Sequence, residues 1–287
     1  MRLAISNIAW MPEQRLAAYT YMNACGFEGL EIAPGLFFHA AEDAFVPDEE
    51  SSSAAIAEIA SEGLQFVSMQ SLLFSVSGAA LFEGPEALAR FEAGMRRAIG
   101  LAGRFFIPNI VFGSPRQRVV PEGMSMKEAL LHAENVFSRL GDAAAEAGTG
   151  IAVEFNPEAY GTNFLTDVDQ TLDFVCQVDH PSIGLCLDIG AMHMNGHFDR
   201  LEEVVKDASS HIFHTHISEP NLAPAPASVE QAERVLSALS EIGYRRWVSI
   251  EMKSVVEGGL PLIQKSIQKL AQANRLYKAA GHGQDAV

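Results

Sequence analysis

Eight short apolar segments alternate with longer amphipathic stretches along almost the whole chain, and this alternation constrains the fold more than any other feature. The apolar segments are continuous, which is typical of strands buried on both faces of a parallel sheet. Several amphipathic stretches end at a glycine shortly before the next apolar segment, as helices do in αβ connections. We therefore predict strands at residues 3–6, 29–34, 64–70, 109–113, 150–155, 183–188, 212–217 and 247–252.

The amphipathic stretches complete eight βα units, with Thr166 as the expected N-cap of one helix. Such units without a break in composition predict an α/β protein with a single (β/α)8 TIM barrel over residues 1–280 and a flexible C-terminal tail at 281–287. The alternative is an open doubly wound sheet, which usually carries a glycine-rich turn after its first strand, where this chain reads SNIAWMP. The predicted helices are 12–24, 52–62, 85–102, 126–147, 167–178, 198–209, 228–242 and 257–279.

Composition limits the partners that this chain can have. A length of 287 residues suits one barrel, and a hydrophobic fraction of 48% can fill its core and is compatible with a homodimer. The formal net charge of −16 disfavours a nucleic-acid partner, because a negative surface repels phosphate backbones. No apolar run reaches the roughly 18 residues of a membrane span, so we expect no membrane partner. Three cysteines without a CxxC spacing and an N-terminus without a signal-peptide core indicate a cytoplasmic protein.

Four metal-binding side chains stand at the carboxyl ends of four successive predicted strands: Glu154, Asp188, His216 and Glu251. One glutamate at a strand end is usually a helix cap or a surface group, but four matched positions favour a joint site. They can converge because the carboxyl ends of neighbouring parallel strands meet at one face of a barrel. Three carboxylates and one imidazole suit one divalent cation, with Mn²⁺ favoured and Mg²⁺, Co²⁺ or Zn²⁺ as alternatives.

Two histidines of the seventh predicted strand, His214 and His216, point to the same face because side chains alternate along a strand. We assign His216 as the ligand and expect His214 to support it from behind or to pack below it.

Several stretches of the chain resemble the sugar isomerase/epimerase family of xylose-isomerase-like TIM barrels, which includes ketose 3-epimerases. The resemblance covers essentially the whole chain. It implies that Glu154, Asp188, His216 and Glu251 bind one divalent metal and that the two glutamates carry out acid–base chemistry. The stretches that carry it are AVEFNPEAYGTNFL (152–165), GLCLDIGAMH (184–193), HTHISEPN (214–221), SIEMK (249–253), LAISNIAW (3–10) and VFGSPRQR (111–118).

This chemistry is consistent with the residues themselves. To isomerise or epimerise a ketose, an enzyme removes a proton from the carbon next to a carbonyl, and a metal stabilises the resulting enediolate. A base on one face removes the proton and an acid on the other returns it, which suits Glu154 and Glu251 on opposite sides of the site. We therefore expect an isomerase or epimerase of a small sugar, sugar phosphate or related hydroxy-ketone. The alternatives are an inosose-type dehydratase and a catalytically silent sugar-binding barrel, whereas the negative charge disfavours a DNA repair nuclease of the same fold.

The chain departs from the ketose epimerases at two positions. Those enzymes have a histidine three residues after the strand-six aspartate, where this chain has Ala191, and an arginine six residues after the metal histidine, where it has Leu222. His193, two residues beyond Ala191, is a candidate replacement for the missing histidine.

Further residues near predicted strand ends are candidates for contact with the substrate. Glu158 follows Glu154 closely enough to hydrogen-bond the substrate or tune that carboxylate, although a solvated loop position is the alternative. Arg116 and Arg118 offer a positive group for a carboxylate or phosphate, with surface ion pairing as the alternative. Gln70 is expected to line the pocket, and Trp10 to form an apolar wall against sugar carbons or to pack in the core.

Overall fold

The computed structural model describes residues 1–255 and 258–279. In this part of the chain, eight parallel strands close into a barrel in sequence order, and β1 pairs with β8, for example Arg2 with Trp247. This closure confirms the (β/α)8 TIM barrel and excludes an open sheet. The strands are β1 (Arg2–Ser6), β2 (Gly29–Ile32), β3 (Gln65–Met69), β4 (Asn109–Phe112), β5 (Gly150–Glu154), β6 (Ile183–Asp188), β7 (Ile212–Ser218) and β8 (Trp247–Glu251).

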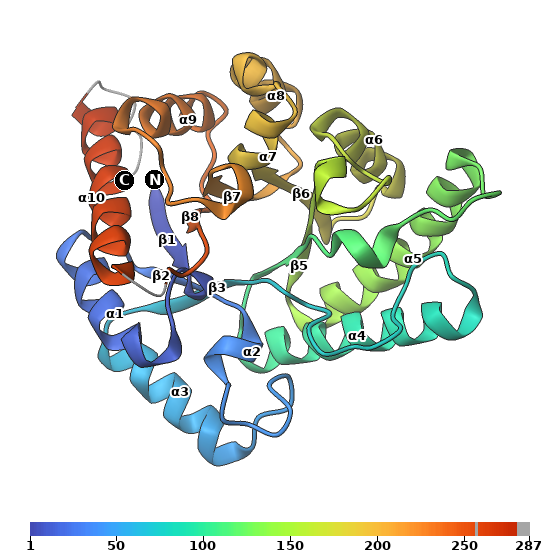
Figure 1. Ribbon diagram of the computed structural model, residues 1–287, viewed down its shortest axis with the longest axis horizontal. Helices are drawn as coiled ribbons and strands as arrows, with labels where there is room; N and C mark the ends of the chain where they lie inside the picture. The colour runs from blue at the N-terminus through green and yellow to red at the C-terminus, as the bar shows by residue number, and fades with distance from the viewer. Residues whose placement is uncertain (256–257, 280–287) are drawn as a thin grey trace.

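Helices form an outer layer around the strands (Figure 1). The last helix, α10, packs against both α9 and α1, so that the two ends of the fold meet. The α-helices are α1 (Arg15–Ala24), α2 (Pro34–Phe37), α3 (Glu49–Ser61), α4 (Pro85–Arg104), α5 (Met126–Ala147), α6 (Val168–Val178), α7 (Ile189–Met194), α8 (Leu201–Asp207), α9 (Val229–Glu241) and α10 (Gly259–Tyr277).

Short helices follow several strands and give the carboxyl face of the barrel defined walls. Besides α2 and α7, they are the 3₁₀ helices η1 (Asn7–Ala9), η3 (Pro115–Arg118), η4 (Glu158–Tyr160) and η6 (Pro220–Leu222). Two others, η2 (Pro12–Gln14) and η5 (Phe198–Arg200), lead into α1 and α8.

The structure corrects the sequence prediction at several helix ends. Asp167, not Thr166, is the N-cap of α6, and its carboxylate accepts the backbone N–H of Gln170 at 2.9 Å. The helix expected at 198–209 begins as η5 and ends at Asp207. The predicted domain limit at residue 280 and the tail at 281–287 lie outside the described residues. Among the described helices, none is long and apolar enough to cross a membrane.

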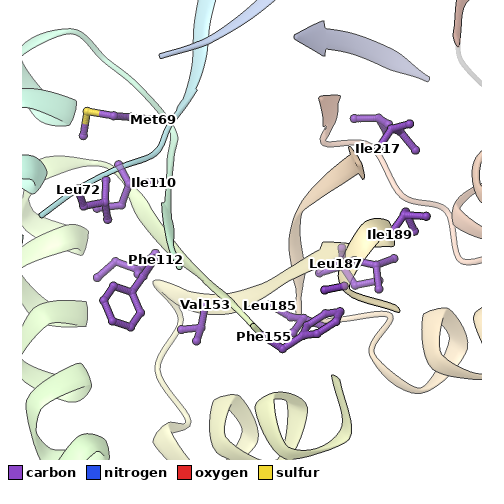
Figure 2. Packing of buried hydrophobic residues seen from close by; sticks show 14 of the residues in the cluster. Met69, Leu72, Ile110, Phe112, Val153, Phe155, Leu185, Leu187, Ile189 and Ile217 are labelled. Atoms are coloured by element: carbon purple, nitrogen blue, oxygen red, sulfur yellow. The ribbon is translucent and has the colours of Figure 1, made fainter. Parts of the chain in front are cut away.

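The main hydrophobic core lies between the strands and the helices. Figure 2 shows Phe112, Val153 and Phe155 on the helix side of β4 and β5, and each is at most 1% exposed. Phe112 packs edge-to-face on Phe137 of α5, with ring centroids 5.2 Å apart, and Phe137 packs in the same way on Phe174 of α6. Full burial of each such side chain contributes about 1.5–3 kcal/mol, which anchors β4 and β5 against their helices.

The barrel interior is apolar near the start of the strands and polar near their ends. The ring of Phe213, near the start of β7, fills the space beside Gly184 of β6, where an added Cβ would lie 2.3 Å from the ring. Further along the strands the buried side chains are polar, with Glu31, Ser68 and Ser249 all 0% exposed. The groups that can bind polar ligands or transfer protons therefore lie toward the carboxyl face of the barrel.

Candidate metal centre

The carboxyl ends of β5 to β8 bring Glu154, Asp188, His216 and Glu251 together. One ligand atom from each of them lies within 4.8 Å of the ligand atoms of the others. Nδ1 of His216 is 3.0 Å from Oε1 of Glu154, 3.5 Å from Oε2 of Glu251 and 3.7 Å from Oδ2 of Asp188. The four strand-end residues therefore form one compact cluster of a nitrogen facing three carboxylates.

The donor set and spacing of this cluster fit a divalent cation. With metal–ligand bonds of about 2.1 Å, ligands on opposite sides of an ion lie about 4.2 Å apart, which is compatible with this spacing. The side chain of His216 is 0% exposed, whereas those of Asp188, Glu251 and Glu154 are 9%, 10% and 12% exposed. Cys186 also lies within 4.8 Å of Glu154 and His216, but burial raises the pKa of its thiol, so it stays a neutral group.

The groups of the cluster shift one another's pKa values, so that protons are retained at the position where a cation would bind. Burial raises the pKa of Glu251 well above its usual value; His216 opposes this rise, and the neighbouring Glu154 and Asp188 carboxylates add to it. Burial lowers the pKa of His216, but the negative groups around it, Glu251 and Glu31 among them, outweigh burial and raise this pKa well above its usual range. Three acids around one imidazole are thus an arrangement that a divalent cation would neutralise.

Local hydrogen bonds fix the orientation of two of the carboxylates. Asp188 is the N-cap of α7, where it accepts the backbone N–H of Ala191, and its Oδ2 accepts the Ser218 hydroxyl at 2.7 Å. The side-chain amide of Asn156 donates to Oε2 of Glu154 at 2.9 Å, which leaves Oε1 on the side of His216.

Arg118 holds backbone carbonyl groups next to the site and is not among the residues that line the cavity. Its side chain is 0% exposed and donates to the carbonyl oxygens of Glu154, at 2.8 Å, and Leu165, at 3.5 Å. Burial lowers its pKa to about 10, with the Glu154 carboxylate opposing this shift. The guanidinium therefore hydrogen-bonds the backbone at the end of β5 and in the following loop, and it is not available to bind a substrate.

Glu31 of β2 is a site residue that the sequence analysis missed. It is 0% exposed, and both of its oxygens lie 3.2 Å from Nε2 of His216, on the opposite side of that ring from the cluster. Burial alone would raise its pKa, but His216 and His214 outweigh burial and hold it well below its usual value. The signal that could have revealed it is a glutamate inside the apolar segment GLEIAP.

His214 lies deeper than His216, as the sequence analysis anticipated when it placed this residue behind or below the ligand. Its ring packs edge-to-face on that of His216, with centroids 5.1 Å apart, and its Nε2 is 3.6 Å from Oε1 of Glu31. Burial lowers its pKa, so the ring is neutral near pH 7.

A cavity of about 690 Å³ opens above the cluster. Glu154, Asp188 and Glu251 lie in its lining. The predicted residues Gln70 and Arg116 line it as well, and so do Ala191 and Leu222, which leave an apolar wall at the two positions of departure.

Tyr160 and Lys253 also line the cavity but were not singled out in the sequence. The Tyr160 hydroxyl accepts the backbone N–H of Asn221 at 3.2 Å. Burial raises the pKa of Tyr160, so it is a neutral phenol that can donate a hydrogen bond into the cavity.

Three other predicted substrate residues lie away from the cavity lining. Trp10 is 2% exposed and packs edge-to-face on Tyr19, with centroids 6.2 Å apart. His193 stacks on Phe198 at 4.1 Å and hydrogen-bonds Gln231. Glu158 is an exposed residue at the start of η4.

A closed parallel barrel with an acidic, histidine-containing cluster under an open cavity defines a TIM barrel with a candidate metal centre. The chain belongs to the xylose isomerase-like TIM barrel family, whose sequence pattern matches residues 20–273. A search of curated proteins gave no significant match.

Solved structures with the same fold include several sugar epimerases. The 3-keto-D-glucoside 4-epimerase YcjR from E. coli has a TM-score of 0.71 and 17% identity, covering 97% of this chain and 99% of that chain. The D-psicose 3-epimerase from Clostridium cellulolyticum H10, solved with D-tagatose, has a TM-score of 0.71 and 16% identity, with the same coverage of 97% and 99%. The D-allulose 3-epimerase from Methylomonas sp. has a TM-score of 0.73 and 19% identity, covering 97% and 96%. At these identities the likeness shows a shared fold.

Proposed function

We propose that this protein is a divalent-metal-dependent isomerase or epimerase of a small sugar, sugar phosphate or related hydroxy-ketone. The observation that carries this proposal is the placement of Nδ1 of His216 among three carboxylates at the base of a cavity of about 690 Å³. The family and the sugar epimerases of the same fold support the same class of reaction.

In this proposal Glu154, Asp188, His216 and Glu251 hold one divalent metal, with Mn²⁺ as the first candidate and Mg²⁺, Co²⁺ and Zn²⁺ as alternatives. When bound, the cation would polarise the carbonyl and the neighbouring hydroxyl of the substrate. It would thereby favour loss of the proton on the carbon that bears this hydroxyl.

Glu154 and Glu251 are the proposed proton-transfer groups. They come from β5 and β8 and reach the same histidine nitrogen from different strands, at 3.0 Å and 3.5 Å. One carboxylate removes the proton from the carbon beside the carbonyl, giving an enediolate, and the other returns a proton to it. The direction of transfer follows from which glutamate is ionised when the substrate arrives.

The cavity lining supports a polyol substrate with a hydrogen-bonded end and an apolar side. Gln70, Asn156 and Tyr160 supply hydrogen-bonding groups, and Arg116 adds a positive group suited to a phosphate or carboxylate. In ketose epimerases, an arginine at the position of Leu222 is expected to bind a substrate oxygen. Here Leu222 places an apolar side chain in the cavity lining. This difference favours a substrate other than a free ketose for this protein.

The proposal extends to where the protein works. Three free cysteines are compatible with a reducing, cytoplasmic setting, and the hydrophobic fraction with a homodimer. Localisation by fractionation and mass measurement in solution test these two points.

Proton exchange tests the proposed function. We load the protein with Mn²⁺ and incubate it in D₂O with a panel of ketoses and their phosphates; deuterium at the carbon beside the carbonyl is the expected result. An enone absorbance without an epimer would identify a dehydratase instead. Metal binding without exchange for any substrate would favour a silent sugar-binding barrel.

A further inference from the structure

Glu31 lies on the Nε2 side of His216, behind the candidate metal centre, and is not among the residues that line the cavity. Its two oxygens accept hydrogen bonds from serine hydroxyls on neighbouring strands, Ser68 at 3.0 Å and Ser249 at 2.8 Å. Each oxygen also lies 3.2 Å from Nε2 of His216. Strands β2, β3, β7 and β8 thus hold one carboxylate in a fixed place behind the histidine.

The hydrogen-bond directions around Glu31 follow from the donors available. Ser68 accepts the side-chain N–H of Asn109 at 2.9 Å, so its own hydroxyl proton is free to point at Glu31. An ionised carboxylate only accepts hydrogen bonds, so the group that faces it must donate. Nε2 of His216 therefore carries the proton that points at Glu31.

A proton on Nε2 determines what Nδ1 can do. In a neutral imidazole one nitrogen donates and the other offers its lone pair, and the partner of the donor nitrogen decides which is which. We propose that Glu31 is the positioning residue that keeps the proton of His216 on Nε2 and so presents the Nδ1 lone pair to the metal. This inference rests on the metal site of the proposed function.

The same three residues could instead form a second cation site, because ligand atoms of Glu31, His214 and His216 also lie within 4.8 Å of one another. Two observations favour the positioning role. The serine hydroxyls already occupy both oxygens of Glu31, and Glu31 and His216 are both 0% exposed, with neither in the cavity lining. A single metal per chain is therefore expected.

Metal titration of the full-length protein tests this role without any substrate. We compare Mn²⁺ binding to the wild type, Glu31→Gln and the control Glu28→Gln, which makes the same change at an exposed position just before β2. The wild type and the control should bind one ion per chain with equal affinity. Glu31→Gln should bind it about 10–100-fold more weakly, as is usual when the partner of a ligating histidine is lost.

Nitrogen NMR gives a readout that a merely structural residue would not affect. With Zn²⁺, which is diamagnetic, and ¹⁵N-labelled histidine, the wild type should show a protonated Nε2 and a metal-bound Nδ1 at His216. If Glu31→Gln fails to fold, the wild-type spectrum and the variant Ser249→Ala still decide the question. Ser249→Ala removes one hydrogen-bond donor to Glu31 but keeps the carboxylate, so a modest loss of Mn²⁺ affinity in this variant supports the proposal.

Four results would overturn the inference in distinguishable ways. Equal Mn²⁺ affinity in Glu31→Gln, or a metal on Nε2, would refute the role of Glu31 and leave the metal centre intact. Two ions per chain, one of them lost in Glu31→Gln, would make Glu31 a ligand. A wild type that binds no metal would refute this inference and the proposed function together.

Discussion

Metal affinity should rise steeply with pH, because a cation must displace a proton from the cluster. The carboxylates around His216 outweigh its burial and raise its pKa well above the usual value of 6.5, which favours the doubly protonated ring in the metal-free protein. In the arrangement proposed above, the Nε2 proton faces Glu31, so the Nδ1 proton has to leave when the metal binds. One displaced proton strengthens binding about tenfold per pH unit, or about 1.4 kcal/mol.

Glu251 determines whether a second proton is released on metal binding, and so how steeply the affinity can rise with pH. Its pKa is also raised well above its usual value of 4.5, and wherever it is protonated a second proton is released on binding. Two protons would give about a hundredfold per pH unit, or about 2.7 kcal/mol. The slope should flatten once the pH exceeds the pKa values of both groups, since no proton then competes with the cation.

Calorimetric titration with Mn²⁺ at pH 6.5, 7.0 and 7.5 measures this slope. Repeating each titration in two buffers of different ionisation enthalpy counts the protons released. Glu28→Gln, an exposed site away from the cluster, serves as the control and should reproduce the wild-type slope. An affinity that stays constant across this range, with no proton release, would refute the reasoning.

Because the pKa of His216 is raised, a rise in pH makes the metal-free protein less stable, whereas it makes metal binding stronger. A folded-state pKa above 6.5 means that His216 contributes its full stabilisation below pH 6.5 and loses it as the pH rises through the folded-state value. The metal-free protein should therefore melt at a lower temperature as the pH rises above 6.5, whereas saturating Mn²⁺ should remove most of this loss.

Three further predictions test the chemistry, the packing and the substrate end of the cavity. Glu154→Gln and Glu251→Gln should each slow deuterium exchange by about 100-fold or more, measured by NMR with metal occupancy verified by elemental analysis; rates equal to the wild type would remove these residues from catalysis. Gly184→Ala should destabilise the fold by about 1–3 kcal/mol, because the new Cβ would lie 2.3 Å from the Phe213 ring. Gly100→Ala, at an exposed position within α4, should instead stabilise the fold by about 0.5–1 kcal/mol, and denaturant melts of the two variants compare these effects. Arg116→Gln should raise KM for a phosphorylated substrate and leave KM for its neutral counterpart unchanged, and an equal effect on both would exclude a phosphate contact.

The order of strands and the grouping of the four strand-end residues could be predicted because both depend on simple regularities. Apolar runs mark strands buried on both faces, and parallel closure brings their carboxyl ends to one face. Asp188 and His216 are direct partners in the register of β6 and β7, so their convergence follows from strand pairing alone. Their role as metal ligands remains a prediction.

Some loop residues, and one carboxylate behind the site, could not be placed in this way. His193 follows Ala191 by two positions within α7, and two helical residues turn the side chain by about 200°, so Ala191 lines the cavity while His193 faces Gln231. Glu31 was missed because attention to strand ends overlooks carboxylates that point into the barrel from within a strand. Thr166 and Asp167 are both good caps, and the structure uses the second of them.

Anomalous diffraction from crystals soaked in Mn²⁺ tests the central claim most directly. The account predicts one peak per chain, at bonding distance from Nδ1 of His216 and from a carboxylate oxygen of each of Glu154, Asp188 and Glu251. No peak at that point, or a peak between Glu31 and His214 instead, would contradict it.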